Sequence, residues 1–210
     1  MRERWGQAGF LSLLHLPEDG QTERATIKTM SQAATKMTYE QYCLLPDDGK
    51  QYEVIDGELF MTPAPKPGHQ RIVLRLAEEL SRFVRENSLG EVFVAPVDVL
   101  LDQHTVLEPD VLFISAARVS IVKEDAIEGP PDLVGEVLSP STFYKDLRKK
   151  MTAYSQFGVQ EYWIVDPETE TIETYARRDD KLELARKFSS GEAVESALLP
   201  GLQLAVKDVL

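Results

Sequence analysis

Two carboxylates lie in segments of the chain that are otherwise strongly apolar. Asp110 stands within residues 106–114, and Glu136 stands within residues 133–138. Because an isolated buried carboxylate is costly, each of the two is expected to have a partner. Two carboxylates on neighbouring strands could bind one side of a hard cation such as Mg²⁺, with water and phosphate oxygens as its other ligands. A structural salt bridge, or an acid hydrogen-bonded in a turn after Pro109, is the alternative interpretation.

Lys150 is the third charged residue whose position in the sequence suggests a role in catalysis. At about 100° per residue, the apolar face of a helix expected over residues 143–157 centres on Leu147, Met151 and Tyr154. Lys150 borders this face, whereas Lys149 is expected to point to water. A lysine near a hydrolytic cation can orient the attacking water or stabilise negative charge on a phosphate. The alternative is an ion pair with Asp146, one helical turn earlier.

Alternating helices and strands are expected to position these three residues. The spacing of apolar residues predicts a helix over residues 70–88, and Gly158 is the expected C-cap of the helix over 143–157. Strands are expected over residues 91–101, 106–115, 132–138 and 161–166. A short helix over 39–44 and a hairpin at the Asp56–Gly57 turn precede them, and residues 171–177 and 182–188 are expected to form a final hairpin.

The composition limits the classes of protein that these elements could form. The chain has 210 residues, 43% of them hydrophobic and 28% charged, which fits one globular domain with a sizeable core. No apolar run reaches the roughly 18–20 residues that a membrane span needs, so a membrane protein is not expected. The single cysteine, Cys43, excludes an intramolecular disulfide and fits a reducing cytoplasm. The three histidines are not spaced as zinc ligands.

Charge and the N-terminal segment add two further expectations. The formal net charge of −12 argues against a protein that coats nucleic acid, although the basic run at residues 145–150 could contact phosphates. A solvated helix face explains the same run equally well. Residues 1–36 contain a short apolar stretch without a signal-peptide cleavage site, and are predicted to form a disordered or loosely attached extension. The globular domain is predicted to span residues 37–210.

Several segments of the sequence resemble one known family. Pro109-Asp110, then Glu136-Val137-Leu138, then a helix carrying Lys150 resemble the PD-(D/E)XK nuclease pattern. More specific segments resemble the Uma-type restriction endonucleases of that superfamily: YEVIDGE at 52–58, HQ at 69–70, EVLSPST at 136–142, Lys150 with Tyr154, and GVQEYWIVDP at 158–167. The resemblance covers about residues 38–205. It implies an α/β (α+β) fold of the restriction-endonuclease type, with a mixed central sheet flanked by helices and extra hairpins at both ends.

The resemblance also implies roles for individual residues. Asp110 and Glu136 would bind the metal ion, with the backbone carbonyl of Val137 as a third ligand. The lysine of the superfamily normally stands two residues after the acid, where this chain has Leu138. Lys150 would replace that lysine from the neighbouring helix.

Three more charged residues lie in segments typical of the family: Glu53, Glu58 and His69. We expect one of them to line the site, Glu53 ahead of His69. The catalytic set expected from the resemblance is therefore Asp110, Glu136, Lys150 and Glu53.

The leading functional hypothesis is hydrolysis of DNA phosphodiester bonds by an endonuclease that uses Mg²⁺, with Mn²⁺ as an alternative cation. A homodimer would suit the cutting of two strands. The first rival hypothesis is an inactive module of the same fold that binds nucleic acid or protein, which Leu138 and the acidic charge favour. The second is a metal-assisted hydrolase of a small phosphate ester.

Overall fold

The computed structural model describes residues 36–62, 64–139 and 144–210. Apart from Lys36, the N-terminal extension predicted at residues 1–36 lies outside the described residues, as do Pro140, Ser141 and Thr142 of the EVLSPST segment. None of the helices in the described part of the chain is long and apolar enough to cross a membrane.

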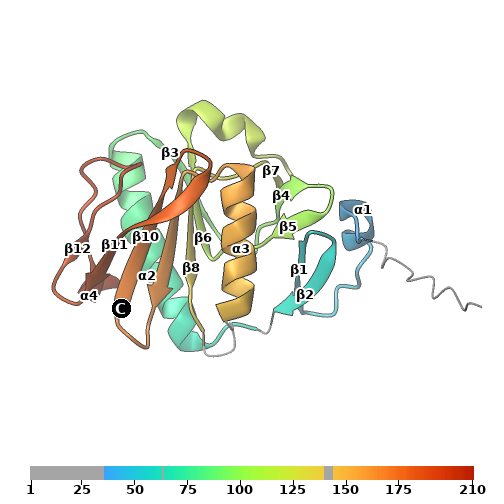
Figure 1. The fold of residues 1–210 in the computed structure, drawn as a ribbon, viewed down its shortest axis with the longest axis horizontal. Helices are drawn as coiled ribbons and strands as arrows, with labels where there is room; N and C mark the ends of the chain where they lie inside the picture. The colour runs from blue at the N-terminus through green and yellow to red at the C-terminus, as the bar shows by residue number, and fades with distance from the viewer. Residues whose placement is uncertain (1–35, 63, 140–143) are drawn as a thin grey trace, which may run out of the picture. The chain divides into compact units, whose positions relative to one another are not determined.

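The larger of two mixed sheets has six strands in the order β11-β10-β9-β8-β6-β3 (Figure 1). Among the described strands of this sheet, β8 and β9 form the parallel pair and the other neighbours run antiparallel. The six strands are β3 (Gly90–Val94), β6 (Val111–Ser115), β8 (Leu133–Val137), β9 (Glu161–Asp166), β10 (Thr171–Arg178) and β11 (Lys181–Ser189).

A second sheet has five strands in the order β2-β1-β5-β4-β7, with β4 and β7 parallel. Its strands are β1 (Gln51–Ile55), β2 (Glu58–Thr62), β4 (Val99–Asp102), β5 (Thr105–Leu107) and β7 (Ile127–Glu128). The short strands β12 (Ala193–Val194) and β13 (Leu204–Ala205) pair with each other. The α/β class and the mixed central sheet with flanking helices are thus confirmed, and the second mixed sheet is an addition to the expected fold.

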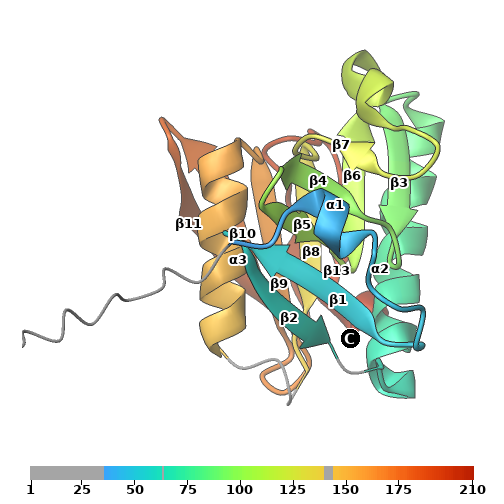
Figure 2. The ribbon, with the colours of Figure 1, turned by 90° about the vertical axis from the view of Figure 1, so that its right-hand side faces the viewer.

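Helices α2 (Pro67–Glu86) and α3 (Tyr144–Phe157) lie on opposite faces of the six-stranded sheet (Figure 2). Side chains alternate between the two faces of a strand, so each face has its own apolar cluster. On the α2 side, the helix packs against residues such as Phe113, Leu133 and Val137. On the α3 side, Leu147 and Tyr154 pack with Leu112, Val134, Tyr162 and Ile164, and the second sheet contributes residues such as Val99 and Leu107.

The expected strands at 91–101 and 106–115 are wrong as single elements, because each is divided between the two sheets. The first becomes β3 and β4, and the second becomes β5 and β6. Pro96 lies in the first break and Pro109 in the second. Proline has no N–H to donate to a ladder, which explains why pairing stops there. Asp110 consequently lies immediately before β6, where the chain passes from one sheet to the other, and not inside a continuous strand.

The other predicted elements are present with bounds that differ by a few residues. α2 begins at Pro67 rather than at residue 70, because proline is well suited to the first turn of a helix. The hairpin between β1 and β2 turns at Asp56 and Gly57, whose φ angles of 52° and 80° are those of a type I′ turn. The short helix α1 (Tyr39–Tyr42) begins with a capping box of Thr38 and Gln41. A 3-10 helix (Ala116–Ile121) and helix α4 (Val206–Val209) complete the described elements, and neither these nor strands β7, β12 and β13 were predicted.

Candidate active site

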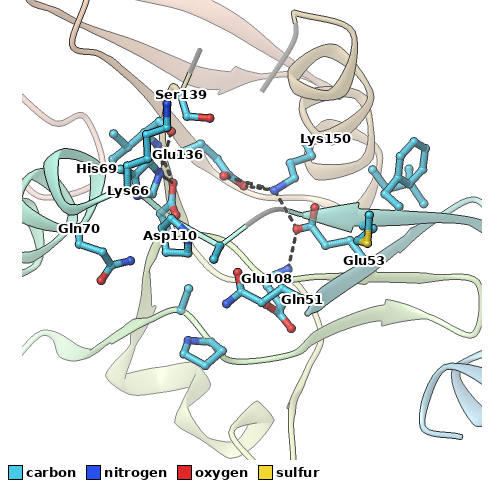
Figure 3. Close-up of a pocket in the computed structure, with 18 residues that line it drawn as sticks. Gln51, Glu53, Lys66, His69, Gln70, Glu108, Asp110, Glu136, Ser139 and Lys150 are labelled. Carbon is cyan, nitrogen blue, oxygen red and sulfur yellow. Dashed lines mark hydrogen bonds and ion pairs between the residues drawn. The ribbon is translucent and has the colours of Figure 1, made fainter. Parts of the chain in front are cut away.

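A cavity of about 490 Å³ collects the residues that the sequence analysis singled out (Figure 3). Asp110, Glu136, Lys150, Glu53 and Val137 all line it, although they come from both sheets and from α3. The other polar residues on its wall are Gln51, Lys66, His69, Gln70, Glu108 and Ser139. Glu58 does not line this cavity, so of the three family-typical residues Glu53 and His69 do so and Glu58 does not.

Glu136 points toward α3 because of its register in β8. Residues two apart share a face of a strand, so Glu136 lies on the face of Val134, and Val137 faces α2. Lys150 Nζ lies 3.2 Å from Glu136 Oε1 and 3.3 Å from Oε2. The hydroxyl of Tyr154, one turn further along α3, donates to Oε1 at 2.9 Å. Glu136 is therefore held by two side chains of a single helix.

Lys150 also reaches the second sheet. Its ammonium lies 2.8 Å from Oε1 of Glu53, and this oxygen accepts a hydrogen bond of 2.9 Å from the backbone N–H of Glu108. Glu53, Glu136 and Lys150 are only 4%, 7% and 7% exposed, so the two acids and the lysine form one buried charge network. Figure 3 shows the lysine between the two acids.

The two lysines of α3 differ as the helical spacing predicts. Lys150 is buried in the cavity wall, whereas Lys149 pairs with Glu58 at 2.8 Å with 43% of its side chain exposed. Lys150 pairs with Glu136 and Glu53; the side chain of Asp146, the alternative partner, lies outside the described residues. The sequence analysis gave a salt bridge as the alternative explanation for Glu136. The structure contains such a bridge, because Glu136 pairs with Lys150.

The side chain of Asp110 extends the hydrogen bonding between β6 and β8 past the last backbone pair. The pairs between β6 and β8 end at Val111 and Gly135. Asp110 Oδ2 then accepts a hydrogen bond of 2.8 Å from the backbone N–H of Val137. His69 Nε2, from the first turns of α2, lies 3.2 Å from the same Oδ2 and 3.1 Å from the carbonyl oxygen of Val137. The Asp110 carboxylate, the Val137 carbonyl and the His69 imidazole are thus close together at the C-terminal end of β8.

Burial and charge set the protonation of this network. Burial raises the pKa of Glu136 to about 7, although the Lys150 ammonium and the Tyr154 hydroxyl lower it. Burial alone would lower the pKa of Lys150, but Glu136 and Glu53 raise it above its usual value. The hydrogen bond to Asp110 raises the pKa of His69, against the effect of burial. Lys150 therefore stays cationic at neutral pH and is suited to stabilise negative charge, not to accept a proton.

Sequence reasoning missed a fourth acidic group on the cavity wall, Glu108. Burial, and then the charges of Asp98 and Glu53, raise the pKa of Glu108 to about 7. Asp98 accepts a hydrogen bond of 2.7 Å from the hydroxyl of Tyr42. The signal was present, because Glu108 is a second charge in the same apolar segment as Asp110. Asp98 and Glu108 belong to two different predicted strands, 91–101 and 106–115. Their contact could therefore be recognised only in the folded structure.

The oxygen donors around the cavity suit a hard cation. Asp110 and Glu136 offer carboxylates and Val137 offers a carbonyl oxygen, the donor types that Mg²⁺ and Mn²⁺ bind. In the described part of the chain, no three His, Cys, Asp or Glu side chains are grouped closely enough to hold a metal ion by themselves. A cation here would need the carbonyl together with water or substrate oxygens, and Mg²⁺ commonly keeps several waters in this way.

Comparisons with known proteins agree with this architecture. A solved structure from Anabaena variabilis, described as a putative nuclease belonging to DUF820, matches with a TM-score of 0.69 at 21% sequence identity. The match covers 82% of this chain and 97% of that one, and it shows a shared fold. No curated protein matches the chain. Residues 38–207 match the family model Uma2, described as "Putative restriction endonuclease". Since that match spans most of the sequence, the chain belongs to the Uma2 family.

Proposed function

We propose that the protein is a metal-dependent endonuclease that hydrolyses phosphodiester bonds of DNA. The observation that carries the proposal is the buried Lys150 ammonium, which lies between Glu136 and Glu53 in a cavity that Asp110 also lines. Membership of a family described as restriction endonucleases supports the same class of reaction.

In this proposal Asp110, Glu136 and the carbonyl of Val137 hold Mg²⁺ or Mn²⁺. When bound, the cation would lower the pKa of the attacking water and neutralise charge on the phosphate. Lys150 supplies a fixed positive charge beside Glu136, where negative charge on a phosphate would increase during hydrolysis. Glu53 holds that ammonium in place from β1, and Glu53 is itself held by the backbone N–H of Glu108. Lys150 thereby performs the role of the lysine that Leu138 replaces.

DNA is the proposed substrate, although the net charge of the chain is −12. Positive groups near the cavity would therefore have to provide the local attraction for phosphates. Lys66 lines the cavity, and the exposed Lys149 lies next to Lys150 on α3. Two copies of the chain would supply one site for each strand of a duplex, so we propose a homodimer as the form that makes double-strand breaks.

Cleavage of supercoiled plasmid tests the proposal directly. Purified protein is incubated with Mg²⁺, with Mn²⁺ or with EDTA, beside Glu136→Gln and the matched control Glu58→Gln, whose acid lies outside the cavity. We expect metal-dependent nicking by the wild type and the control, and none by Glu136→Gln. If folded wild-type protein nicks no plasmid with either metal, the proposal is wrong.

A non-catalytic module of the same fold is the second candidate. Leu138, at the position of the usual lysine, is partly buried against the α3-side apolar cluster, which leaves no charged group at that place in the motif. This candidate predicts no heat of binding when millimolar Mg²⁺ is titrated into the protein. It also predicts that Glu136→Gln binds DNA or a partner protein as the wild type does.

A further inference from the structure

His69 contacts two of the oxygen atoms that the proposed cation would use. Its Nε2 atom lies 3.2 Å from Asp110 Oδ2 and 3.1 Å from the carbonyl oxygen of Val137. We propose that His69 is itself a ligand of this cation, through Nε2, and that it makes the site prefer Mn²⁺ over Mg²⁺. The inference rests on the proposed function, because it concerns the same metal site.

The two distances are those expected between donors that share one cation. At metal–ligand distances of about 2.1 Å, neighbouring donors of an octahedron are about 3.0 Å apart. Nε2 is 3.2 Å from one oxygen and 3.1 Å from the other, so a cation could replace the proton on Nε2 without a large movement of these three donors. Among the described residues Glu136 is not grouped closely with Asp110 and His69, so it would move toward the cation or bind it through water. A neutral ring would bind the cation as the tautomer with its proton on Nδ1, whereas an imidazolium ring would release the Nε2 proton to solvent and keep the Nδ1 proton.

The polar contacts of the His69 ring are made by Nε2. His69 Nδ1 is buried and has no hydrogen-bond partner among the described residues. The orientation of the ring is therefore determined on its polar side by the contacts of Nε2 alone. His69 also lies at the start of the long helix α2, whose packing against the sheet fixes the position of its backbone.

An imidazole ligand changes which cation the site prefers. Carboxylate and carbonyl oxygens bind Mg²⁺ and Mn²⁺ alike, whereas imidazole nitrogen favours first-row transition ions. A site made of Asp110, Glu136 and Val137 alone would accept either ion. With His69 added, Mn²⁺ gains a ligand that Mg²⁺ binds poorly, so the affinity for Mn²⁺ should rise relative to Mg²⁺.

A different role of His69 makes the opposite prediction. The Nε2 proton could donate to both oxygens simply to fill the place of a cation. His69 would then compete with the metal ion, and its removal would raise the affinity for Mn²⁺. A ligand and a competitor thus differ in the sign of the effect of one substitution.

The test is electron spin-echo spectroscopy of Mn²⁺ bound to tag-free protein, together with calorimetric titration of Mn²⁺ and Mg²⁺. The chain has three histidines, so His69→Gln is compared with His104→Gln. His104 contacts the carbonyl of Met37 and is not part of the cavity wall. We expect imidazole ¹⁴N modulation in the wild type and in His104→Gln, and its loss in His69→Gln. The Mn²⁺ affinity of His69→Gln should fall by at least about tenfold, and that of Mg²⁺ much less.

Two results would overturn the inference, and they have different meanings. Mn²⁺ that binds wild-type protein without nitrogen modulation, or binds His69→Gln as tightly as wild type, removes His69 from the ligand set and leaves the nuclease proposal in place. Absence of metal binding by the wild type overturns this inference and the proposed function together. The spectrum of the wild type decides the first point even if His69→Gln does not fold.

Discussion

Lys150 and Glu53 form a buried ion pair of 2.8 Å that joins helix α3 to strand β1 of the second sheet. The ammonium is shared with Glu136 of the six-stranded sheet. Because a buried charge needs its partners, this arrangement makes the stability of the fold depend on Lys150, a residue that we propose for catalysis.

Lys150→Ala should therefore destabilise the protein as well as abolish cleavage. The substitution leaves Glu53 and Glu136 buried without their cation, and breaking such a network typically costs about 3–5 kcal/mol. Urea unfolding in EDTA measures the effect. Lys149→Ala, which removes the neighbouring exposed lysine, is the control and should cost about 0–1 kcal/mol. Equal stability of the two variants would contradict the buried network.

Two adjacent buried tyrosines should respond differently to loss of their hydroxyl groups. The rings of Tyr154 and Tyr162 lie 5.4 Å apart, but Tyr154 donates to Glu136, whereas the hydroxyl of Tyr162 has no partner in the described part of the chain. Tyr154→Phe should lower the free energy of unfolding by about 1–3 kcal/mol, and Tyr162→Phe should leave it unchanged or raise it. A similar loss in both variants, measured by urea unfolding, would mean that Tyr162 has a partner.

Stability should fall with increasing pH because of Glu108. Burial, then Asp98 and Glu53, raise its pKa from 4.5 to about 7 in the folded protein. The folded state therefore holds this proton more tightly, so the contribution of Glu108 is greatest below about pH 4.5 and is lost as the pH rises through 7. We expect the difference in unfolding free energy between wild type and Glu108→Gln, in EDTA, to change across this window as the wild type loses that contribution.

Substitution of an exposed acid provides the control for that measurement. Glu183 lies exposed on the edge strand β11, and Glu183→Gln should give a pH profile parallel to that of the wild type. If Glu108→Gln is also parallel to the wild type, Glu108 does not hold its proton more tightly in the folded state.

Restoring the usual motif lysine should bring no gain. Leu138 is partly buried against the apolar cluster on the α3 side of the sheet, and Lys150 already places an ammonium beside Glu136. Leu138→Lys would bury a second positive charge near the first, so we expect lower stability, by about 1–3 kcal/mol, and plasmid nicking no faster than wild type. Leu138→Met is the control, because it changes the shape of the side chain without adding a charge. Faster nicking by Leu138→Lys would show that Lys150 does not replace the motif lysine.

Much of the fold follows from local patterns in the sequence. The helical spacing of apolar residues predicts α2 and α3, and it separates the buried Lys150 from the exposed Lys149. The breaks at Pro96 and Pro109 were missed because long apolar runs suggested continuous strands, although proline cannot continue a ladder. Their consequence, the division of these runs between two sheets, depends on pairings between distant segments that local patterns do not contain.

The sequence predicted which residues belong to the candidate site better than it predicted which of them contact each other. Costly charges in apolar segments pointed to Asp110 and Glu136, and family resemblance added Glu53. The contact of Glu53 with Lys150 requires β1 to pack near α3, and that of His69 with Val137 requires α2 to begin beside the end of β8. The spacing of residues along the chain does not show that these elements lie close together. The contacting residues could therefore be identified only in the folded structure.

The passage of the chain from β5 to β6 at Pro109 and Asp110 has a consequence for how function is lost. Glu53 is carried by one sheet and Glu136 by the other, so neither sheet contains all the residues that we propose for catalysis. A partly unfolded molecule that keeps only one sheet would be chemically inert. The proposed cleavage activity should therefore require that the two sheets are packed together. A substitution that weakens the contact between the sheets should abolish this activity before the protein unfolds.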